Sequence, residues 1–166
     1  IRPKDPFEIH MDDMRVPDRA MFGGLGEGFE LAASGVRTSR ILYSAAHLGI
    51  ARKALEMALD YAKQRETFGK PLSERQSIRW MIADSATQIH TARLAVYDCA
   101  WKADNDIDVR HEASMVKLHS SEMLHDVLDR AIQIHGGMGV AKDLPLERWY
   151  REGRIRRIGE GPSEIQ

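Results

Sequence analysis

The sequence predicts an all-α protein, an antiparallel four-helix bundle with a short extended N-terminal segment. Two observations carry this prediction. No glycine occurs from Pro71 to His135, and Pro71 is the only proline between Asp18 and Leu144; uninterrupted stretches of this kind favour helices. Apolar residues also recur at alternating spacings of three and four, which is the helical period. The 166 residues are enough for one domain with one hydrophobic core.

The N-terminal part of the chain differs in composition from the rest. Residues 1–28 hold seven prolines and glycines, which are Pro3, Pro6, Pro17, Gly23, Gly24, Gly26 and Gly28. A short alternating piece, Phe7 to Met11, indicates a candidate strand. The chain begins at Ile1 without an initiator Met or a signal segment. We therefore expect the tail of another domain followed by a linker, in a piece of a longer protein.

Three long helices and one short helix follow. The first is expected from about Gly28 to Arg65, on the apolar stripe Leu48, Ala51, Leu55, Ala58 and Ala62. The second carries the stripe Ile78, Ile82, Ser85, Ile89, Ala92, Val96, Cys99 and Ala103. The third carries Ala113, Val116, Ser120, Leu124, Val127, Ala131 and Ile134. A shorter, charged helix is expected from about Pro145 to Arg157.

Capping signals place the helix ends. Ser73 and Gln76 have the spacing of a capping box, so they predict the start of the second helix. Asp108 stands where the third helix needs an N-cap, and Gly136 with Gly137 predicts where that helix stops.

Composition excludes several classes of function. With 24 basic and 25 acidic residues the net charge is −1, so general attraction to nucleic acid or an anionic membrane is not expected. No apolar run approaches the length of a membrane span. Cys99 is the only cysteine and lies on an apolar stripe, which favours a buried packing role.

A metal site is not expected either. The seven histidines lack the spacing of a zinc helix. The acidic loop at residues 104–108 resembles the start of a calcium loop, but Val109 replaces the turn glycine and Met115 replaces the bidentate glutamate. The loop is better interpreted as a solvated turn between helices.

A cluster of arginines near the C-terminus creates a local positive charge, and its members are Arg148, Arg151, Arg154, Arg156 and Arg157. The cluster fits a solvated helix face, a phosphate-bearing cofactor, or acidic groups on a partner subunit. Nucleic acid is the least favoured of these ligands, because no series of aromatic residues accompanies the arginines.

Two glycine-rich segments point to a site. In Gln133-Ile134-His135-Gly136-Gly137-Met138-Gly139 a helix ends in glycines, which permits a C-cap and lets a phosphate approach the backbone. In Gly159-Glu160-Gly161-Pro162-Ser163-Glu164 a carboxylate lies between glycines. Glu160 fits a helix cap or a reactive base with room for a substrate beside it.

These segments belong to a longer ordered pattern. It consists of Arg65-Glu66-Thr67-Phe68-Gly69-Lys70-Pro71-Leu72, then Gln76, then the Gln133 to Gly139 segment, then Glu160-Gly161-Pro162-Ser163-Glu164-Ile165-Gln166. The pattern resembles the C-terminal helical domain of the flavoprotein acyl-CoA dehydrogenases. Residues 9–17 are similar to the last strand of the family's middle β domain. The resemblance implies that residues 1–25 are the tail of that β domain and a linker, and that 26–166 are the helical domain, ending inside its last helix.

The resemblance also implies a function. It implies FAD as cofactor and α,β-dehydrogenation of an acyl-CoA thioester, with Glu160 as the base that takes the α-proton. Gly161 matches a residue of the thioester pocket, and Arg40 matches a substrate-region arginine. The positions that match FAD contacts are Arg65, Phe68 and Gln76, toward the FAD of a neighbouring subunit, and Gln133, Gly136 and Gly137, toward its diphosphate and adenosine part.

The implied partners are an acyl-CoA substrate, an acceptor of the electron-transfer flavoprotein type, and further copies of the chain in a dimer or tetramer. The implied location is the cytoplasm in a bacterium or the mitochondrial matrix in a eukaryote. An isolated piece of this length is expected to be inactive, since the family's other domains supply the remaining walls of the site.

The sequence departs from the family pattern at three positions. Ser39 stands where some members carry their base, which favours Glu160 in that role. Arg37 replaces an acid that contacts acyl-CoA in some members, and Pro162 replaces the usual threonine and so removes a hydroxyl and an N–H.

Other interpretations stay open at this stage. Gln76 also fits the capping box alone, and Phe68 also fits a packing role. The same scaffold suits an acyl-CoA oxidase or a nitroalkane-oxidase-like flavoenzyme, and the bundle stripes by themselves suit a helical interaction module without chemistry.

Overall fold

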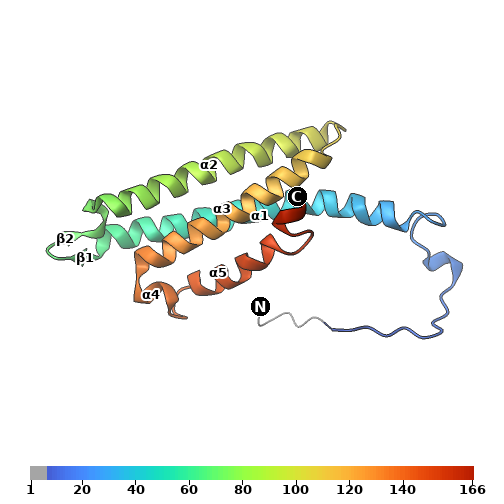
Figure 1. Cartoon of the computed structure of the whole chain (residues 1–166), viewed down its shortest axis with the longest axis horizontal. Helices are drawn as coiled ribbons and strands as arrows, with labels where there is room; N and C mark the ends of the chain where they lie inside the picture. The colour runs from blue at the N-terminus through green and yellow to red at the C-terminus, as the bar shows by residue number, and fades with distance from the viewer. Residues whose placement is uncertain (1–6) are drawn as a thin grey trace.

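The computed structural model describes residues 7–166 and is almost entirely helical (Figure 1). Its long helices are α1 (Gly28–Gln64), α2 (Gln76–Asp104) and α3 (Arg110–His135), followed by the shorter α4 (Gly137–Val140) and α5 (Leu146–Arg154). A two-stranded antiparallel hairpin, β1 (Glu66–Thr67) and β2 (Lys70–Pro71), joins α1 to α2. Short 3-10 turns cover Asp18–Ala20, Leu72–Glu74, Ile155–Arg157 and Ser163–Ile165. The predicted all-α bundle of three long helices and one short helix is confirmed.

Side-chain contacts between the helices give their directions. Ser85 and Gln88 of α2 face Arg130 of α3, whereas Lys102 further along α2 reaches back to Glu112, so α2 and α3 are antiparallel. Along the contact between α1 and α3 the residue numbers of the two helices increase together. The contacting pairs are Arg40–Ser114, His47–Ser120 and Tyr61–His135. Helices α1 and α3 therefore run parallel and side by side. Helix α5 is antiparallel to α3, since Tyr150 lies against His125 and Arg157 against Glu122.

The core lies between α1 and α3, and α2 and α5 complete it. Helix α1 contributes a face of small residues that are fully buried, which are Ala51, Ala54, Ala58 and Ala62. Helix α3 contributes larger buried side chains, which are Met123, Leu124, Val127 and Leu128. Burial of each such side chain contributes about 1.5–3 kcal/mol. The alanine face lets the two backbones approach closely, so the register between α1 and α3 is well determined. Cys99 is buried, as its place on the stripe of α2 predicts.

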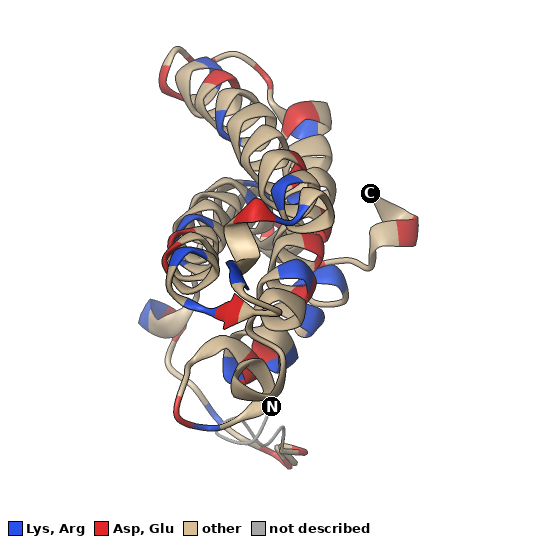
Figure 2. Cartoon of the chain, turned by 90° about the vertical axis from the view of Figure 1, so that its left-hand side faces the viewer, with Lys and Arg blue, Asp and Glu red and all other residues tan. Residues whose placement is uncertain are grey.

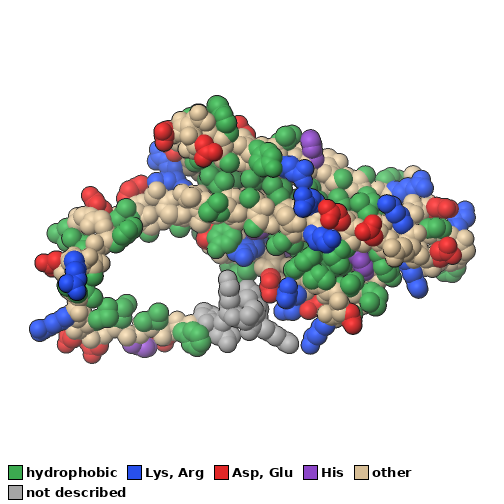
Figure 3. All heavy atoms as spheres, turned by 180° about the vertical axis from the view of Figure 1, so that it is seen from behind, with side chains coloured by type: hydrophobic (Ala, Val, Ile, Leu, Met, Phe, Trp, Pro, Cys, Tyr) green, Lys and Arg blue, Asp and Glu red, His purple; other side chains and the backbone are tan. Residues whose placement is uncertain are grey.

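The segment before α1 forms no strand in its described part. Residues 7–17 lack regular secondary structure, and their apolar side chains Phe7, Ile9, Met11 and Met14 are exposed (Figure 3). The candidate strand from Phe7 to Met11 is therefore wrong for this chain. A strand requires a neighbouring strand for its backbone hydrogen bonds, and the described residues place none beside it. The assignment of residues 1–25 to a β-domain tail and linker stays a prediction, and residues 1–6 lie outside the described part.

The predicted caps are met only in part. The capping box of Ser73 and Gln76 is wrong, because a 3-10 turn at Leu72–Glu74 delays the start of α2 to Gln76 and leaves Arg75 as the N-cap without a side-chain bond. At the start of α3, Val109 is the N-cap, but the carboxylate of Asp108 accepts a hydrogen bond from the Arg110 backbone N–H at 3.1 Å. Asp108 therefore accepts a hydrogen bond from the first turn of α3, although it stands one residue before the N-cap. Helix α3 ends before Gly136, as predicted.

A buried histidine makes the stability of the bundle depend on pH. His47 lies inside the bundle with its Nδ1 atom 3.0 Å from Ser120 Oγ. Burial, then the charges of Arg156 and Lys117, lower the pKa of His47 to about 4. The unfolded chain takes up this proton near its ordinary pKa of about 6.5, whereas the folded chain does so only near pH 4. The stability that His47 contributes is therefore fully present above about pH 6.5 and is lost as the pH falls toward 4.

We expect this loss to amount to the order of 2 to 3 kcal/mol between about pH 7 and pH 4.5. The measurement is urea unfolding of the protein and of its His47→Gln variant, followed by circular dichroism across that range. The gap in unfolding free energy between the two proteins should shrink as the pH falls. A gap that stays constant would contradict a neutral, buried His47.

Candidate functional site

The turn that carries Glu160 has an unusual backbone. Glu160 has φ +59° and Gly161 has φ +99°, so two consecutive residues occupy the left-handed region. Glycine adopts this region freely, but a glutamate pays a conformational cost there, and surrounding contacts must hold it in place. Such strain at a carboxylate between glycines is typical of a functional position.

Three donors from three parts of the chain hold this turn. Arg40 on α1 donates from Nη2 to the Glu160 carbonyl at 2.9 Å. Lys117 on α3 donates from Nζ to the Gly161 carbonyl. Gln166 donates from Nε2 to the same carbonyl at 2.9 Å. The two successive carbonyls thus lie against the α1–α3 pair, and the glutamate carboxylate lies beside Ser39.

The Glu160 carboxylate has a hydroxyl beside it that suits both of its protonation states. Ser39 Oγ lies 2.9 Å from Glu160 Oε2 and also 2.9 Å from the Val36 carbonyl. A hydroxyl has one hydrogen and can also accept. When Glu160 is ionised, Ser39 can donate to it. When Glu160 has taken up a proton, it can donate to Ser39, which then turns its hydrogen to Val36. The arrangement therefore accommodates a carboxylate that gains and loses a proton.

Two cations flank the turn without binding the carboxylate. Arg40 also donates from Nη1 to Ser114 Oγ at 3.0 Å, which fixes its guanidinium between α1 and α3. Lys117 is only 3% exposed, and burial, then the charge of Arg40, lower the pKa of its ammonium group, against the charges of Glu160 and Glu164. The contacts of Arg40 and Gly161 are thus internal to the site, while their predicted substrate contacts stay predictions.

Lys117, Ser39 and Ser114 were not predicted as site residues. A sequence signal for Lys117 does exist, because it lies four residues after Ala113 and three before Ser120, on the buried stripe of α3. A charged residue at an apolar position of a bundle helix needs a buried partner. Ser114 carries no comparable signal. Arg37 pairs with Glu30 on the same helix at 3.2 Å, which occupies its side chain within α1.

The predicted cofactor residues gather at the opposite end of the bundle. Arg65 and Phe68 belong to the hairpin between α1 and α2, and Gln76 begins α2 (Figure 1). Phe68 is 98% exposed and has φ +51°. The guanidinium carbon of Arg75 lies 6.0 Å from the centre of its ring. The packing interpretation of Phe68 therefore finds no support within the described part of this chain, because the side chain is almost fully exposed.

The end of α3 lies at the same end of the bundle. Gln133 is exposed, and Gly136 turns the chain with φ +58° and ψ −133° before α4 begins at Gly137. Next to this turn a pocket of about 290 Å³ opens between α1 and α3, and it is lined by Met57, Asp60, Tyr61, Gln64, His135, Met138 and Leu144. Two of these lining residues, Tyr61 and His135, have rings stacked with their centroids 4.5 Å apart.

The chemistry at the hairpin end fits a flavin dinucleotide. An exposed guanidinium, exposed amide side chains and an unprotected aromatic ring offer diphosphate binding and ring stacking in one place. Apart from adjoining residues and the local helix backbone, no atom lies within 4 Å of where a Cβ would stand at Gly136 or Gly137, so a ligand can approach the backbone there. Among residues 7–166, no group of three or more His, Cys, Asp or Glu side chains is placed to hold a metal ion.

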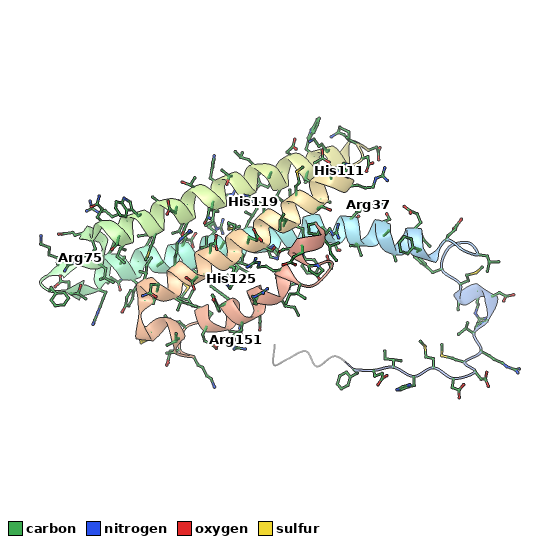
Figure 4. The ribbon with its side chains drawn as sticks, viewed as in Figure 1. Arg37, Arg75, His111, His119, His125 and Arg151 are labelled. Atoms are coloured by element: carbon green, nitrogen blue, oxygen red, sulfur yellow. The ribbon has the colours of Figure 1, made fainter. Side chains whose placement is uncertain are left out.

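The two ends of the bundle are far apart along α1. Arg40 and Arg65 are separated by 25 residues of a continuous helix, which is about 37 Å at 1.5 Å per residue. In Figure 4, Arg75 marks the hairpin end, and Arg37 lies on the part of α1 toward the other end. The structure therefore brings Glu160, Gly161 and Arg40 together, and it places the six predicted cofactor residues at the other end of the bundle.

The arginines near the C-terminus are partly engaged within the chain. Arg151 pairs with Glu147 at 2.8 Å, Arg157 pairs with Glu122 at 3.1 Å, and Arg156 lies over the ring of Tyr43 at 4.5 Å. Basic and acidic residues are interspersed along the ribbon in Figure 2. No helix in the described part of the chain is long and apolar enough to cross a membrane.

Comparison with known proteins identifies the family. The family model for the acyl-CoA dehydrogenase C-terminal domain matches residues 26–166. The chain is 40% identical over 166 residues to the mitochondrial short-chain specific acyl-CoA dehydrogenase of Bos taurus, which covers all of this chain and 40% of that protein. It is 39% identical over 159 residues to the CarC subunit of the caffeyl-CoA reductase-Etf complex of Acetobacterium woodii, covering 96% of this chain and 42% of that protein. The chain belongs to the acyl-CoA dehydrogenase family and spans about two fifths of the length of these relatives.

Solved structures agree with this assignment. Butyryl-CoA dehydrogenase from Megasphaera elsdenii superposes with a TM-score of 0.88 at 39% identity, over 92% of this chain and 40% of that chain. PigA, in a structure with FAD and proline, superposes with a TM-score of 0.90 at 30% identity, over 93% of this chain and 40% of that chain. The helical domain is thus shared with flavoproteins.

The turn at Gly136 gives a test of local backbone strain. Gly136→Ala places a side chain in a region that L-residues rarely adopt, although the surrounding space is open. We expect a loss of about 1–3 kcal/mol in unfolding free energy. Gly137→Ala is the matched control, because Gly137 begins α4 with open space around it and no positive φ. Thermal unfolding of both variants checks the expectation, and equal stability of the two would contradict it.

Proposed function

We propose that this chain is the C-terminal domain of an FAD-dependent acyl-CoA dehydrogenase in which Glu160 takes the α-proton of an acyl-CoA thioester. The observation that carries the proposal is the position of the Glu160 carboxylate. It lies in a strained turn whose carbonyls are bound by Arg40, Lys117 and Gln166, and Ser39 is its hydrogen-bond partner. The relatives' names, which include a short-chain specific acyl-CoA dehydrogenase and a subunit of a caffeyl-CoA reductase-Etf complex, support an acyl-CoA substrate.

The chemistry asks for a positioned base. A proton α to a thioester is weakly acidic, so a carboxylate fixed within hydrogen-bond reach lowers the barrier for its removal. Glu160 takes the α-proton from the substrate carbon and becomes a carboxylic acid, which Ser39 can accommodate as an acceptor. The two-electron oxidant that takes the hydride from the β-carbon, and so leaves the α,β-unsaturated product, would be supplied by FAD held at the residues described next.

The residues at the hairpin end are proposed to hold FAD. Arg65 would grip the diphosphate with its forked guanidinium. Phe68 would offer its exposed ring, Gln76 and Gln133 their amides, and Gly136 with Gly137 an open backbone. Because Arg65 lies about 37 Å along α1 from Arg40, whose guanidinium binds the Glu160 carbonyl, these residues are proposed to serve the flavin of a neighbouring copy of the chain.

If the base and the cofactor residues of one chain serve two different active sites, the protein must form an oligomer. The outward face of α2 exposes Leu94, Tyr97 and Trp101 at helical spacing, and Trp80 is exposed near the start of the same helix. Exposed apolar residues on one face are typical of an interface. We propose a dimer or tetramer. The name of the CarC relative, a subunit of an Etf complex, supports an electron-transfer flavoprotein as the acceptor.

Replacement of the proposed base tests the reaction. Glu160→Gln keeps the shape and the contact with Ser39 but removes the base, so we expect the full-length protein to keep its FAD and to lose at least about 10²-fold in the rate of anaerobic flavin bleaching by acyl-CoA. Stopped-flow absorbance measures this rate. Glu164→Gln, at an exposed position in the same segment, is the matched control and should bleach at the normal rate. Unchanged bleaching in Glu160→Gln would overturn the assignment of the base.

Replacement of Arg65 tests the cofactor site. Arg65→Met removes a charge-assisted donor worth about 1.5–3 kcal/mol, so we expect FAD to bind about 10- to 100-fold more weakly in the full-length protein. Equilibrium titration of the apoprotein with FAD, followed by flavin fluorescence, checks this. Arg148→Met, at an exposed arginine of α5, should bind FAD normally. Equal affinity in the two variants would count against the hairpin site.

A second candidate function is an oxidase on the same scaffold, of the acyl-CoA or nitroalkane type. The likeness to PigA, whose structure contains FAD and proline, favours this alternative because it shows the helical domain with a ligand that is not a thioester. Peroxide release during turnover, measured against reduction of an artificial electron acceptor, separates an oxidase from a dehydrogenase. A full-length protein that contains no flavin would instead favour a helical interaction module.

A further inference from the structure

Lys117 is a buried lysine whose ammonium group has a defined use. It is 3% exposed and comes from the N-terminal half of α3, between the core residues Val116 and Met123. Lysine is almost never fully buried without a partner, because removing its charge from water is costly. The cost is visible in the pKa of Lys117, which burial lowers. Its ammonium group donates to the Gly161 carbonyl, next to the proposed base.

We propose that Lys117 is a positioning residue, which holds the Glu160–Gly161 turn so that the Glu160 carboxylate is directed at the substrate. The inference rests on the proposed function of Glu160. It assigns to Lys117 a contribution to the rate of proton removal, without contact with the reacting atoms.

The backbone of the turn explains why such a residue is needed. Glu160 stays in the left-handed region only while its surroundings offset the conformational cost. Its own carbonyl is bound by Arg40 and the next carbonyl by Lys117, from two helices that are packed rigidly against each other. Gln166 also binds the Gly161 carbonyl, but it comes from the C-terminal segment itself. Lys117 is therefore the link between that carbonyl and the bundle core.

The placement of the charges matters as much as the hydrogen bonds. A cation bound directly to a carboxylate favours its ionised form and makes it a weaker base. Lys117 and Arg40 bind backbone carbonyls instead, while Ser39 bonds to the carboxylate. The turn is thus fixed by strong, charged donors that bind its backbone, and the carboxylate has the neutral hydroxyl of Ser39 as its hydrogen-bond partner. A displacement of about 1 Å in such a group costs on the order of 10²-fold in rate.

The experiment compares Lys117→Met, Lys117→Gln and Lys117→Arg in the full-length flavoprotein. The limiting rate of anaerobic flavin reduction and the apparent Kd for acyl-CoA are measured separately, by varying the acyl-CoA concentration in a stopped-flow instrument. We expect Lys117→Met and Lys117→Gln to lower the limiting rate by about 10- to 100-fold. The apparent Kd should change less than about threefold, and the FAD content should stay normal. Lys117→Arg, which keeps a charged donor, should recover most of the rate.

Lys102→Met is the matched control, because Lys102 pairs with Asp98 and Glu112, away from the turn. It should reduce flavin at the normal rate. If Lys117→Met fails to fold, Lys117→Gln carries the same expectation, since its amide suits a buried polar site better than a thioether does. Normal limiting rates in the folded Met or Gln variant, or a folded Arg variant as slow as these, would overturn the role of Lys117. Failure of the proposed function is distinguishable, because the unmodified protein would then show no flavin reduction by acyl-CoA.

Discussion

The close, parallel packing of α1 against α3 is the constraint on which the rest of the structure depends. Four alanines on α1 let the helices meet along their length, and the larger side chains of α3 fill the space around them. This packing brings Ser39 and Arg40 next to Ser114 and Lys117, where the Glu160 turn can be held between them. The same packing stacks Tyr61 on His135 at the other end and so places the end of α3 beside the hairpin.

Sequence reasoning could predict the helices because their signals are local. The spacing of apolar residues and the absence of glycine between Pro71 and His135 determine where helices are stable, and the structure places them within a few residues of those limits. The candidate cofactor and base residues could be singled out only as members of motifs. Periodicity alone says nothing of the distance between Arg65 and Glu160, which depends on the direction in which α1 runs past α3.

The features that sequence reasoning missed depend on local turn geometry or on tertiary contacts. Ser73 has a capping spacing, but the turn after Pro71 tightens into a 3-10 helix and moves the start of α2 beyond its reach. The strand expected from Phe7 to Met11 depends on a neighbour that alternation cannot supply. Lys117 departs from the pattern of its stripe, and only the return of the chain at Gly161 explains why a charge is tolerated there.

The length of α1 has a consequence for how this domain can vary. One uninterrupted helix carries the Ser39 and Arg40 contacts near one end and Arg65 at the other. Deleting a single residue between Ser44 and Ala62 would rotate one end relative to the other by about 100° and shorten the span by about 1.5 Å. The alanine face would then turn away from α3 over half of its length. Loops such as the one between α2 and α3 can change in length. The number of residues in α1 cannot, because the contacts at both of its ends depend on it.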